Sequence, residues 1–287
     1  MMGHILSLAF LARMVRSAVP LVLAALGGSI TERSGLVDLA LEAKLLFGAF
    51  VAACVGHATD SAVLGIVAAM GVGMLIAGIQ AFFALVLEAD QVIVGVALNA
   101  IALGGTRFLL QLIYGEGANS PPFDGLGEAV LGNPLVWLAA IAAITVPLAV
   151  VRTRWGLRLR ATGDRPESLV AVAVSPIKAR FAAALVGGAL AGAGGAQLSL
   201  SVNGFSAEMS GGRGYIALAM VILAGWRPGI AALACLGMAL AATLAIELEI
   251  AGVGIPGDLV QLLPYVLTLV VLVIAGGRPP PQALGKA

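Results

Sequence analysis

Charged residues are scarce in this chain of 287 residues. Asp, Glu, Lys and Arg make up 11% of it, whereas hydrophobic residues make up 60%. A soluble domain usually carries about 25% charged residues, so too little charge is present to coat a water-exposed surface. This composition excludes a soluble enzyme, a nucleic-acid-binding protein and a disordered protein. We expect a polytopic membrane protein, and at roughly 20 residues per helical span the length allows about eight to ten spans.

Residues for thiol, metal or nucleotide chemistry are also few. Cys54 and Cys235 lie in apolar stretches, where buried thiols are expected rather than a disulfide. His4 and His57 are the two histidines of the chain, and we expect no metal site and no cofactor. The sequence also has no Gly-x-x-x-x-Gly-Lys-Ser/Thr phosphate loop. If the protein uses ATP, the nucleotide site is on another chain.

Long apolar runs, bounded by charge, Pro or Gly, predict membrane-spanning helices. The runs are continuous, whereas a membrane β-barrel needs short segments of alternating hydrophobicity, so the predicted fold is an all-α membrane bundle. We treat residues 1–287 as a single transmembrane domain. The predicted spans cover roughly residues 17–30, 36–56, 61–87, 91–113, 134–151, 181–201, 212–225, 228–250 and 259–276.

Basic residues predict the orientation. Segment 152–180 holds seven of the sixteen Lys and Arg residues, which places it in the cytoplasm by the positive-inside rule. Four predicted spans follow it, so the C-terminus is expected on the same side. Counting five spans backwards puts residues 115–133 and the N-terminus outside, and this leaves Arg13 and Arg16 on the side that the rule disfavours.

Two sequence patterns concern helix packing. Stripes of small residues at fourfold spacing predict close helix–helix contacts; they are Gly65, Ala69, Gly73 and Ala77, and Ala184, Gly188, Gly192 and Ala196. Residues 35–41 resemble residues 214–220, and each segment is followed by a second long helix. In the predicted topology the two sets of helices run in opposite directions, which is typical of an inverted repeat. A chance match between Leu- and Ala-rich stretches is the alternative.

Part of segment 152–180 is predicted to form a short helix. Asp164 can cap a helix, Pro166 suits its first turn, and Glu167 favours its positive end. The residues after Pro166 are expected to form a helix of about ten residues, roughly 15 Å long. An apolar helix in water needs a cover, so docking to a cytoplasmic partner is expected. The alternative is a solvated connector.

The same run carries a family resemblance. Residues 163–167, preceded by Leu157-Arg-Leu-Arg-Ala161, resemble the cytoplasmic coupling loop of ABC importer permeases. The branch concerned serves simple sugars, branched-chain amino acids and nucleosides. Other stretches, in order along nearly the whole chain, are similar to the shorter permease subunit of the nucleoside and simple-sugar transporters. They are Thr31–Val37 with Glu42, Asp90-Gln91 with Gly95 and Asn99, Gly212–Ala219 with Gly225–Pro228, and Pro264-Tyr265.

The resemblance implies a division of labour. The permease forms the path through the inner membrane of a prokaryote, and catalyses no reaction itself. Its implied partners are a cytoplasmic ABC ATPase, a second and longer permease subunit, and an extracytoplasmic substrate-binding protein. The resemblance also implies that the permease contacts membrane lipid and binds no nucleic acid. The residues implied in ATPase coupling are Gly163, Asp164, Pro166, Glu167 and Ser168.

Polar residues inside the predicted spans are candidates for the substrate pathway, because burying them in lipid is costly. Gln91 and Asn99 lie on one small and polar face of the span at 91–113. Asn99 is the strongest candidate, since its amide can donate and accept; interhelical hydrogen bonding is the alternative. Asp38 and Glu42 share a face at the start of the span at 36–56, with either a structural role or contact with substrate. Lys44 is not an obvious partner of Glu42, because the two side chains face different sides.

Three tryptophans and one arginine have simpler predicted roles. Trp137, Trp155 and Trp226 lie near predicted membrane interfaces, where anchoring is expected. Arg107 is expected to pair with Glu116.

The leading functional hypothesis is the membrane-spanning subunit of an ATP-driven importer for nucleosides or a related small polar solute, such as a simple sugar. A stand-alone secondary carrier would need coupling carboxylates in mid-membrane, but Glu247, Glu249 and Asp258 lie near an outer end of the predicted spans. A membrane enzyme would need a catalytic cluster within a span, and the sequence shows none.

Overall fold

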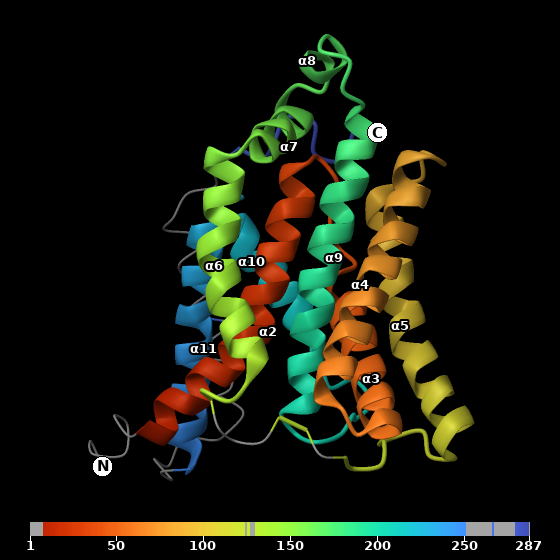
Figure 1. The fold of residues 1–287 in the computed structure, drawn as a ribbon, viewed down its shortest axis with the longest axis vertical. Coiled ribbons are helices and arrows are strands. Elements are labelled where there is room, and N and C mark those ends of the chain that lie inside the picture. Colours follow the sequence, from red (N-terminus) through yellow and green to blue (C-terminus); the bar gives the residue numbers. More distant parts are fainter. Residues whose placement is uncertain (1–7, 124, 127–129, 251–265, 267–278, 287) are drawn as a thin grey trace.

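The computed structural model describes residues 8–123, 125–126, 130–250, 266 and 279–286, and this part of the chain is an all-α bundle (Figure 1). Seven of its helices are long and apolar enough to cross a membrane. The helices are α2 (Leu8–Arg33), α3 (Leu41–Thr59), α4 (Ala62–Leu85), α5 (Gln91–Tyr114), α6 (Pro134–Arg152), α7 (Arg154–Asp164), α8 (Glu167–Val170), α9 (Pro176–Leu200), α10 (Arg213–Leu223) and α11 (Pro228–Ile250).

The bundle has two distinct ends. Helices α7 and α8 cap one of them, which we call the α7–α8 end, and residues 279–286 lie there too (Figure 1). The backbone N–H of Ala283 donates to the carbonyl oxygen of Gly163 at 2.8 Å. The loops after α5 and after α9 meet at the opposite end, where the N–H of Ser120 donates to the carbonyl oxygen of Phe205 at 2.8 Å. The C-terminal residues and segment 152–180 therefore share one end, as the span count predicted.

Several predicted spans differ from the observed helices. Helix α2 extends beyond residues 17–30 at both ends, and α9 begins five residues before the predicted start. The predicted span at 212–225 is wrong, because α10 has 11 residues and is about 16 Å long, too short for a hydrocarbon core of about 30 Å. The predicted span at 36–56 is helical only from Leu41 onwards. Apart from Val266, the predicted span at 259–276 lies outside the described residues.

The predicted ten-residue helix after Pro166 is also wrong. Helix α8 has four residues, and Asp164 is the last residue of α7 rather than a cap of α8. Thr153 caps α7 by accepting from the N–H of Gly156 at 3.0 Å. Arg165, at φ −148°, leaves the helical region, as expected of a residue before proline. The left-handed backbone of Ala173, at φ +58°, ends the turn after α8.

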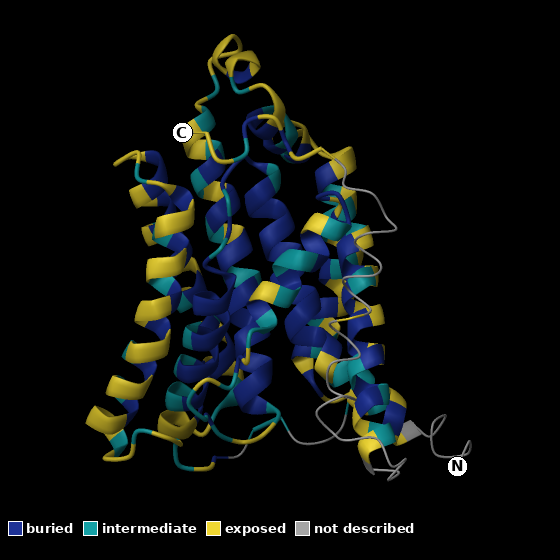
Figure 2. Cartoon of the chain, turned by 180° about the vertical axis from the view of Figure 1, so that it is seen from behind, coloured by how far each residue is buried: buried dark blue, intermediate teal, exposed yellow. Residues whose placement is uncertain are grey.

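Helix α9 lies at the centre of the bundle, between α2, α3 and α4 (Figure 1). It contacts α4 so closely that a Cβ at Gly188 would overlap the carbonyl oxygen of Gly73. A Cβ at Gly192 would likewise overlap the carbonyl oxygen of Ala69. These contacts confirm the predicted small-residue stripes. Burial follows the same plan, with a buried centre and long exposed faces on the outer helices (Figure 2).

The direction of the helices agrees with the predicted inverted repeat. Helices α3 and α11 run away from the α7–α8 end, whereas α10 and α4 run towards it (Figure 1). The long helices that precede α3 and α10, α2 and α9, are also antiparallel (Figure 1). Each half therefore has a long helix, a break, a second helix and a third, in opposite orientation. The helix predicted to open at Asp258 lies outside the described residues.

Candidate translocation site

The first break in the bundle, residues 34–40, connects α2 to α3 without helical structure and is still buried. Side chains satisfy its backbone, as a non-helical segment at membrane depth requires. The Oε1 of Gln91 accepts from the N–H of Val37, and the Nε2 of Gln80 donates to the carbonyl oxygen of Val37, both at 2.8 Å. The Nδ2 of Asn99 donates to the carbonyl oxygen of Leu39 at 2.8 Å.

Asn99, the strongest pathway candidate, binds three protein groups. Besides Leu39, its Nδ2 donates to the hydroxyl of Tyr215 at 3.0 Å, and its Oδ1 accepts from the N–H of Ala43 at 2.9 Å. The residue is 3% exposed. This geometry fits the structural alternative for Asn99 and likewise for Gln91, while contact of either residue with a solute stays a prediction.

Two of the charged residues form an ion pair at the break. The Nζ of Lys44 binds the Oδ1 of Asp38, and both side chains are fully buried. Lys44 reaches back over the first turn of α3, because Asp38 precedes the helix. Helix-face spacing could not predict this pair, since it assumed a helix from residue 36.

Glu32, at the end of α2, holds the break to the other half of the bundle. Its Oε1 accepts from the N–H of Asp38 at 3.2 Å, and its Oε2 accepts from the Nε1 of Trp226 at 2.6 Å. Trp226 is 6% exposed, so its predicted role as an interface anchor is wrong. The predicted partner of Arg107 is also wrong, because the guanidinium binds Glu208 at 2.7 Å rather than Glu116.

Glu42 joins the two breaks. Its carboxylate, in the first turn of α3, accepts from the Oγ of Ser210 at 2.6 Å and from the N–H groups of Gly212 and Gly214 at 2.9 and 2.7 Å. These donors lie at the N-terminus of α10, where unpaired N–H groups and the helix dipole favour an anion. A Cβ at Gly214 would overlap the backbone of Glu42. Two interrupted helices therefore begin at one point and run apart from it.

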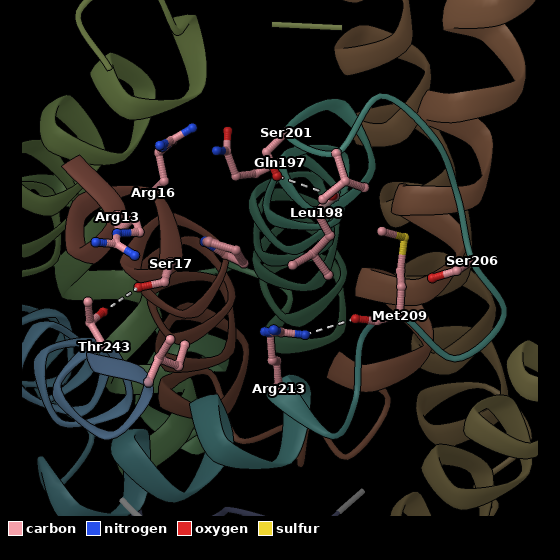
Figure 3. A pocket seen from close by; sticks show the side chains of 13 residues that line it. Arg13, Arg16, Ser17, Gln197, Leu198, Ser201, Ser206, Met209, Arg213 and Thr243 are labelled. Carbon is pink, nitrogen blue, oxygen red and sulfur yellow. Dashed lines mark hydrogen bonds between the residues drawn. The ribbon is translucent and has the colours of Figure 1, made fainter. Parts of the chain in front are cut away.

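A pocket of about 500 Å³ opens beside this point (Figure 3), towards the end of the bundle away from α7 and α8 (Figure 1). We call it the arginine pocket, after Arg13, Arg16 and Arg213 in its wall. Its walls come from α2, α9, α10, α11 and the loop at 201–212. Pro20 lies within α2 and lines the pocket, and a proline there removes a backbone hydrogen bond and bends the helix.

The first turns of α2 pack on α11 at this pocket. Arg13 forms an ion pair with Glu247, and the hydroxyls of Ser17 and Thr243 lie 3.4 Å apart. In the pocket wall, Gln197 is 1% exposed and its Oε1 accepts from the Nδ2 of Asn133 at 2.9 Å. Its Nε2 is buried and has no partner among the described residues.

A second junction lies at the α7–α8 end. Gly163 packs so closely on the end of α2 that a Cβ there would overlap the carbonyl oxygen of Arg33. The C-terminal segment covers this contact: besides the bond from Ala283 to Gly163, the N–H of Gly285 donates to the carbonyl oxygen of Gly35 at 3.1 Å. The Nη1 of Arg180 donates to the carbonyl oxygen of Lys286 at 2.8 Å. Helix α7 thus lies directly against the start of the break.

The tip beyond this junction is exposed. Asp164, Glu167 and Ser168 are exposed and Pro166 is partly so, whereas Gly163 is buried. The apolar side chains of Val170 and Val172 are 65% and 66% exposed. Docking of a cytoplasmic partner on this tip stays a prediction.

Comparison with known proteins identifies the family. The model of the family described as "branched-chain amino acid transport system / permease component" matches residues 10–272. The chain belongs to this permease family. The permease is a multi-pass protein of the plasma membrane, and the resemblance to ABC importer permeases is confirmed. No solved structure matches the permease at a significant level.

Curated relatives cover most of the permease. The guanosine ABC transporter permease protein NupQ of Bacillus subtilis is 33% identical over 91% of this chain and 90% of its own length. The nucleoside ABC transporter permease protein NupC of Lactococcus lactis is 31% identical over 93% and 92%. The putative glucose ABC transporter permease protein TsgC13 of Haloferax volcanii is 34% identical over 75% and 70%.

The arginine pocket of the permease was not predicted from the sequence. Its walls come from segments far apart in the chain, and neither Gln197 nor Asn133 belongs to a recognisable motif. The sequence feature that could have indicated the pocket was the pair Arg13 and Arg16, which the predicted topology places on the side that the positive-inside rule disfavours. Their position in a pocket wall gives these cations a place other than a lipid-facing surface.

Proposed function

We propose that the permease translocates a nucleoside, or a related small polar solute such as a simple sugar, as one subunit of an ATP-driven importer. The observation that carries this proposal is the meeting of two interrupted helices at Glu42, next to the arginine pocket. Transporter sites commonly form between inverted repeats, at interrupted helices. The pocket volume of about 500 Å³ is within the usual range for small-molecule sites, and relatives named for guanosine and nucleosides support the solute class.

The proposal includes three partners. An ABC ATPase, on a separate chain, docks in the cytoplasm on Asp164, Pro166, Glu167 and Ser168 with the exposed apolar residues beside them, while the buried Gly163 transmits the contact. The α7–α8 end is then cytoplasmic, and the arginine pocket opens towards the opposite side, where a binding protein delivers the solute. A second, longer permease subunit completes the path. The guanosine ABC transporter permease protein NupP of Bacillus subtilis is also similar, at 24% identity, and two guanosine permease proteins in one organism support a paired arrangement.

The contacts suggest how the ATPase acts on the pocket. A displacement of α8 moves α7, and α7 packs through Gly163 on the end of α2 and the start of the break. The break is tied to α10 through Glu42, and Arg213 at the start of α10 lines the pocket. In this scheme Asn99, Gln91 and Asp38 border the path by holding the break in shape, so that it moves as one body.

Purification from native membranes tests the proposal. The tagged permease should bring an ABC ATPase and a second permease subunit with it in stoichiometric amounts. A stand-alone carrier would instead be purified alone and would transport solute into vesicles without any ATPase. That result would reject the importer and favour the secondary carrier.

A further inference from the structure

The amide of Gln197 has a fixed orientation in the wall of the arginine pocket. Its Oε1 is held by the Nδ2 of Asn133 at 2.9 Å, and the Oδ1 of Asn133 is in turn held by the N–H of Leu135 at 2.9 Å, at the start of α6. Because Asn133 is oriented by a helix cap, Gln197 cannot rotate without breaking this chain of hydrogen bonds. The Nε2 of Gln197 therefore remains as a fixed donor.

This donor has no partner among the described residues, although Gln197 is 1% exposed. In Figure 3 the amide of Gln197 is turned towards the side of the pocket where Arg13 and Arg16 lie. An unpaired buried donor is costly, so the site is complete only when an occupant supplies an acceptor.

The surroundings favour a strongly negative acceptor. Arg16 and Arg213 line the same pocket, and the Nη1 of Arg213 is fixed by the carbonyl oxygens of Met209 and Ser210 at 2.8 and 3.1 Å. Among the residues that the structure describes, Glu247 is the one carboxylate paired with an arginine of this wall, and it binds Arg13. The field of the guanidinium groups favours a carbonyl oxygen over an amino group, whose N–H would face other donors.

We propose that Gln197 determines the base specificity of the permease by donating from Nε2 to a carbonyl oxygen of the nucleobase. This inference rests on the proposed transport of nucleosides. An amide with both groups available would suit adenine, which needs one donor and one acceptor. With Oε1 engaged by Asn133, Gln197 offers a donor alone. The pocket therefore prefers a 6-oxopurine nucleoside to a 6-aminopurine nucleoside.

Inosine and adenosine are the matched probes, because they differ at position 6 of the purine and at the protonation of N1. The permease complex with its ATPase, free of binding protein, is loaded with labelled inosine, and each unlabelled nucleoside is used to displace it. For the native complex we expect inosine to compete at a concentration about tenfold lower than adenosine, as for one mismatched hydrogen bond. Equal competition by the two nucleosides would overturn the inference.

Two variants assign the preference to Gln197. Gln197→Glu keeps an acceptor for Asn133 and replaces the free donor by an acceptor. The ratio of the competing concentrations of adenosine and inosine should then fall below one, so that adenosine is preferred. Gln197→Met removes both groups, and the ratio should approach one. Gln111→Met, the same substitution at an exposed position of α5 outside the pocket, serves as the control, and its ratio should equal that of the native complex. A native ratio retained in both Gln197 variants would contradict the assignment.

ATP-driven uptake into vesicles by the same complexes, with the second permease subunit present and the binding protein now supplied, separates the specificity role from the proposed importer function. Uptake that persists, with the same preference for inosine over adenosine in the native complex and the Gln197 variants, would reject the specificity role but not the proposed importer function. Absence of nucleoside binding and of uptake in the native complex would reject both. Co-purification of the ATPase and an unchanged thermal unfolding profile show that each variant is assembled.

Discussion

Replacing Glu42 with glutamine should loosen the junction between the two interrupted helices. The carboxylate accepts three hydrogen bonds, from Ser210 and from the backbone of Gly212 and Gly214. A glutamine is nearly the same size and keeps one oxygen. Its other group is an NH₂, which would face the N–H of Gly214 as donor against donor.

The magnitude follows from these three bonds. Leaving the buried N–H of Gly214 unpaired costs about 1–3 kcal/mol. The two remaining bonds change from charge-assisted to neutral, which costs about 1 kcal/mol each. The free energy of unfolding should therefore fall by about 3–5 kcal/mol in Glu42→Gln. The same change at the exposed Glu116 is the control, and there we expect less than about 0.5 kcal/mol.

Two assays measure the consequence. Equilibrium unfolding in mixed micelles gives the loss of stability, and vesicle uptake with simultaneous ATP hydrolysis gives the coupling. Because Glu42 ties the break to α10, we expect Glu42→Gln to hydrolyse ATP while transporting little solute. Stability and uptake equal to those of Glu116→Gln would refute the role of Glu42 as the connection between the two halves.

Three further perturbations test other contacts. Asn99→Leu removes the hydrogen-bond partner of the carbonyl oxygen of Leu39 in the break and of the N–H of Ala43 in α3. It should lower the free energy of unfolding by about 2–6 kcal/mol, whereas the exposed control Val96→Leu should leave it unchanged. Equal unfolding of the two variants would show that the break does not depend on Asn99. Glu167→Arg with Ser168→Trp should abolish ATPase docking and uptake without altering the unfolding of the permease, and normal uptake would reject the docking surface. Deletion of residues 279–287 removes the backbone bonds over the first break, so uptake per ATP hydrolysed should fall at least severalfold, and an unchanged ratio would show that this segment has no part in coupling.

The fold was predictable where it depends on composition and spacing. Continuous apolar runs predicted the long helices, and stripes of small residues at fourfold spacing predicted close helix–helix contacts. Which helices make these contacts, α4 and α9, was not predicted. Breaks are harder, since Leu36 and Leu39 are as apolar as any helical residue. Only the tertiary partners of the break, such as Gln80 and Gln91, make a non-helical backbone stable there.

In the candidate site, too, single residues were predictable from the sequence, whereas their tertiary partners were not. Glu42 was singled out as an unusual charge in an apolar stretch, but its partners lie more than 160 residues away in the chain and no periodicity connects them. The Asp38–Lys44 pair was missed because its geometry depends on the helix beginning at Leu41. Asn133 and Gln197 meet only because the start of α6 packs beside the end of α9.

ATP-driven uptake by the defined assembly tests the central claim most directly. The permease is reconstituted into vesicles with its co-purifying ATPase and second permease subunit, and the binding protein and a labelled nucleoside are supplied on the side of the arginine pocket. Nucleoside should accumulate when ATP is present on the side of the α7–α8 end, and accumulation should cease when the ATPase carries a substitution that abolishes hydrolysis. Accumulation that continues without ATP hydrolysis would contradict the account.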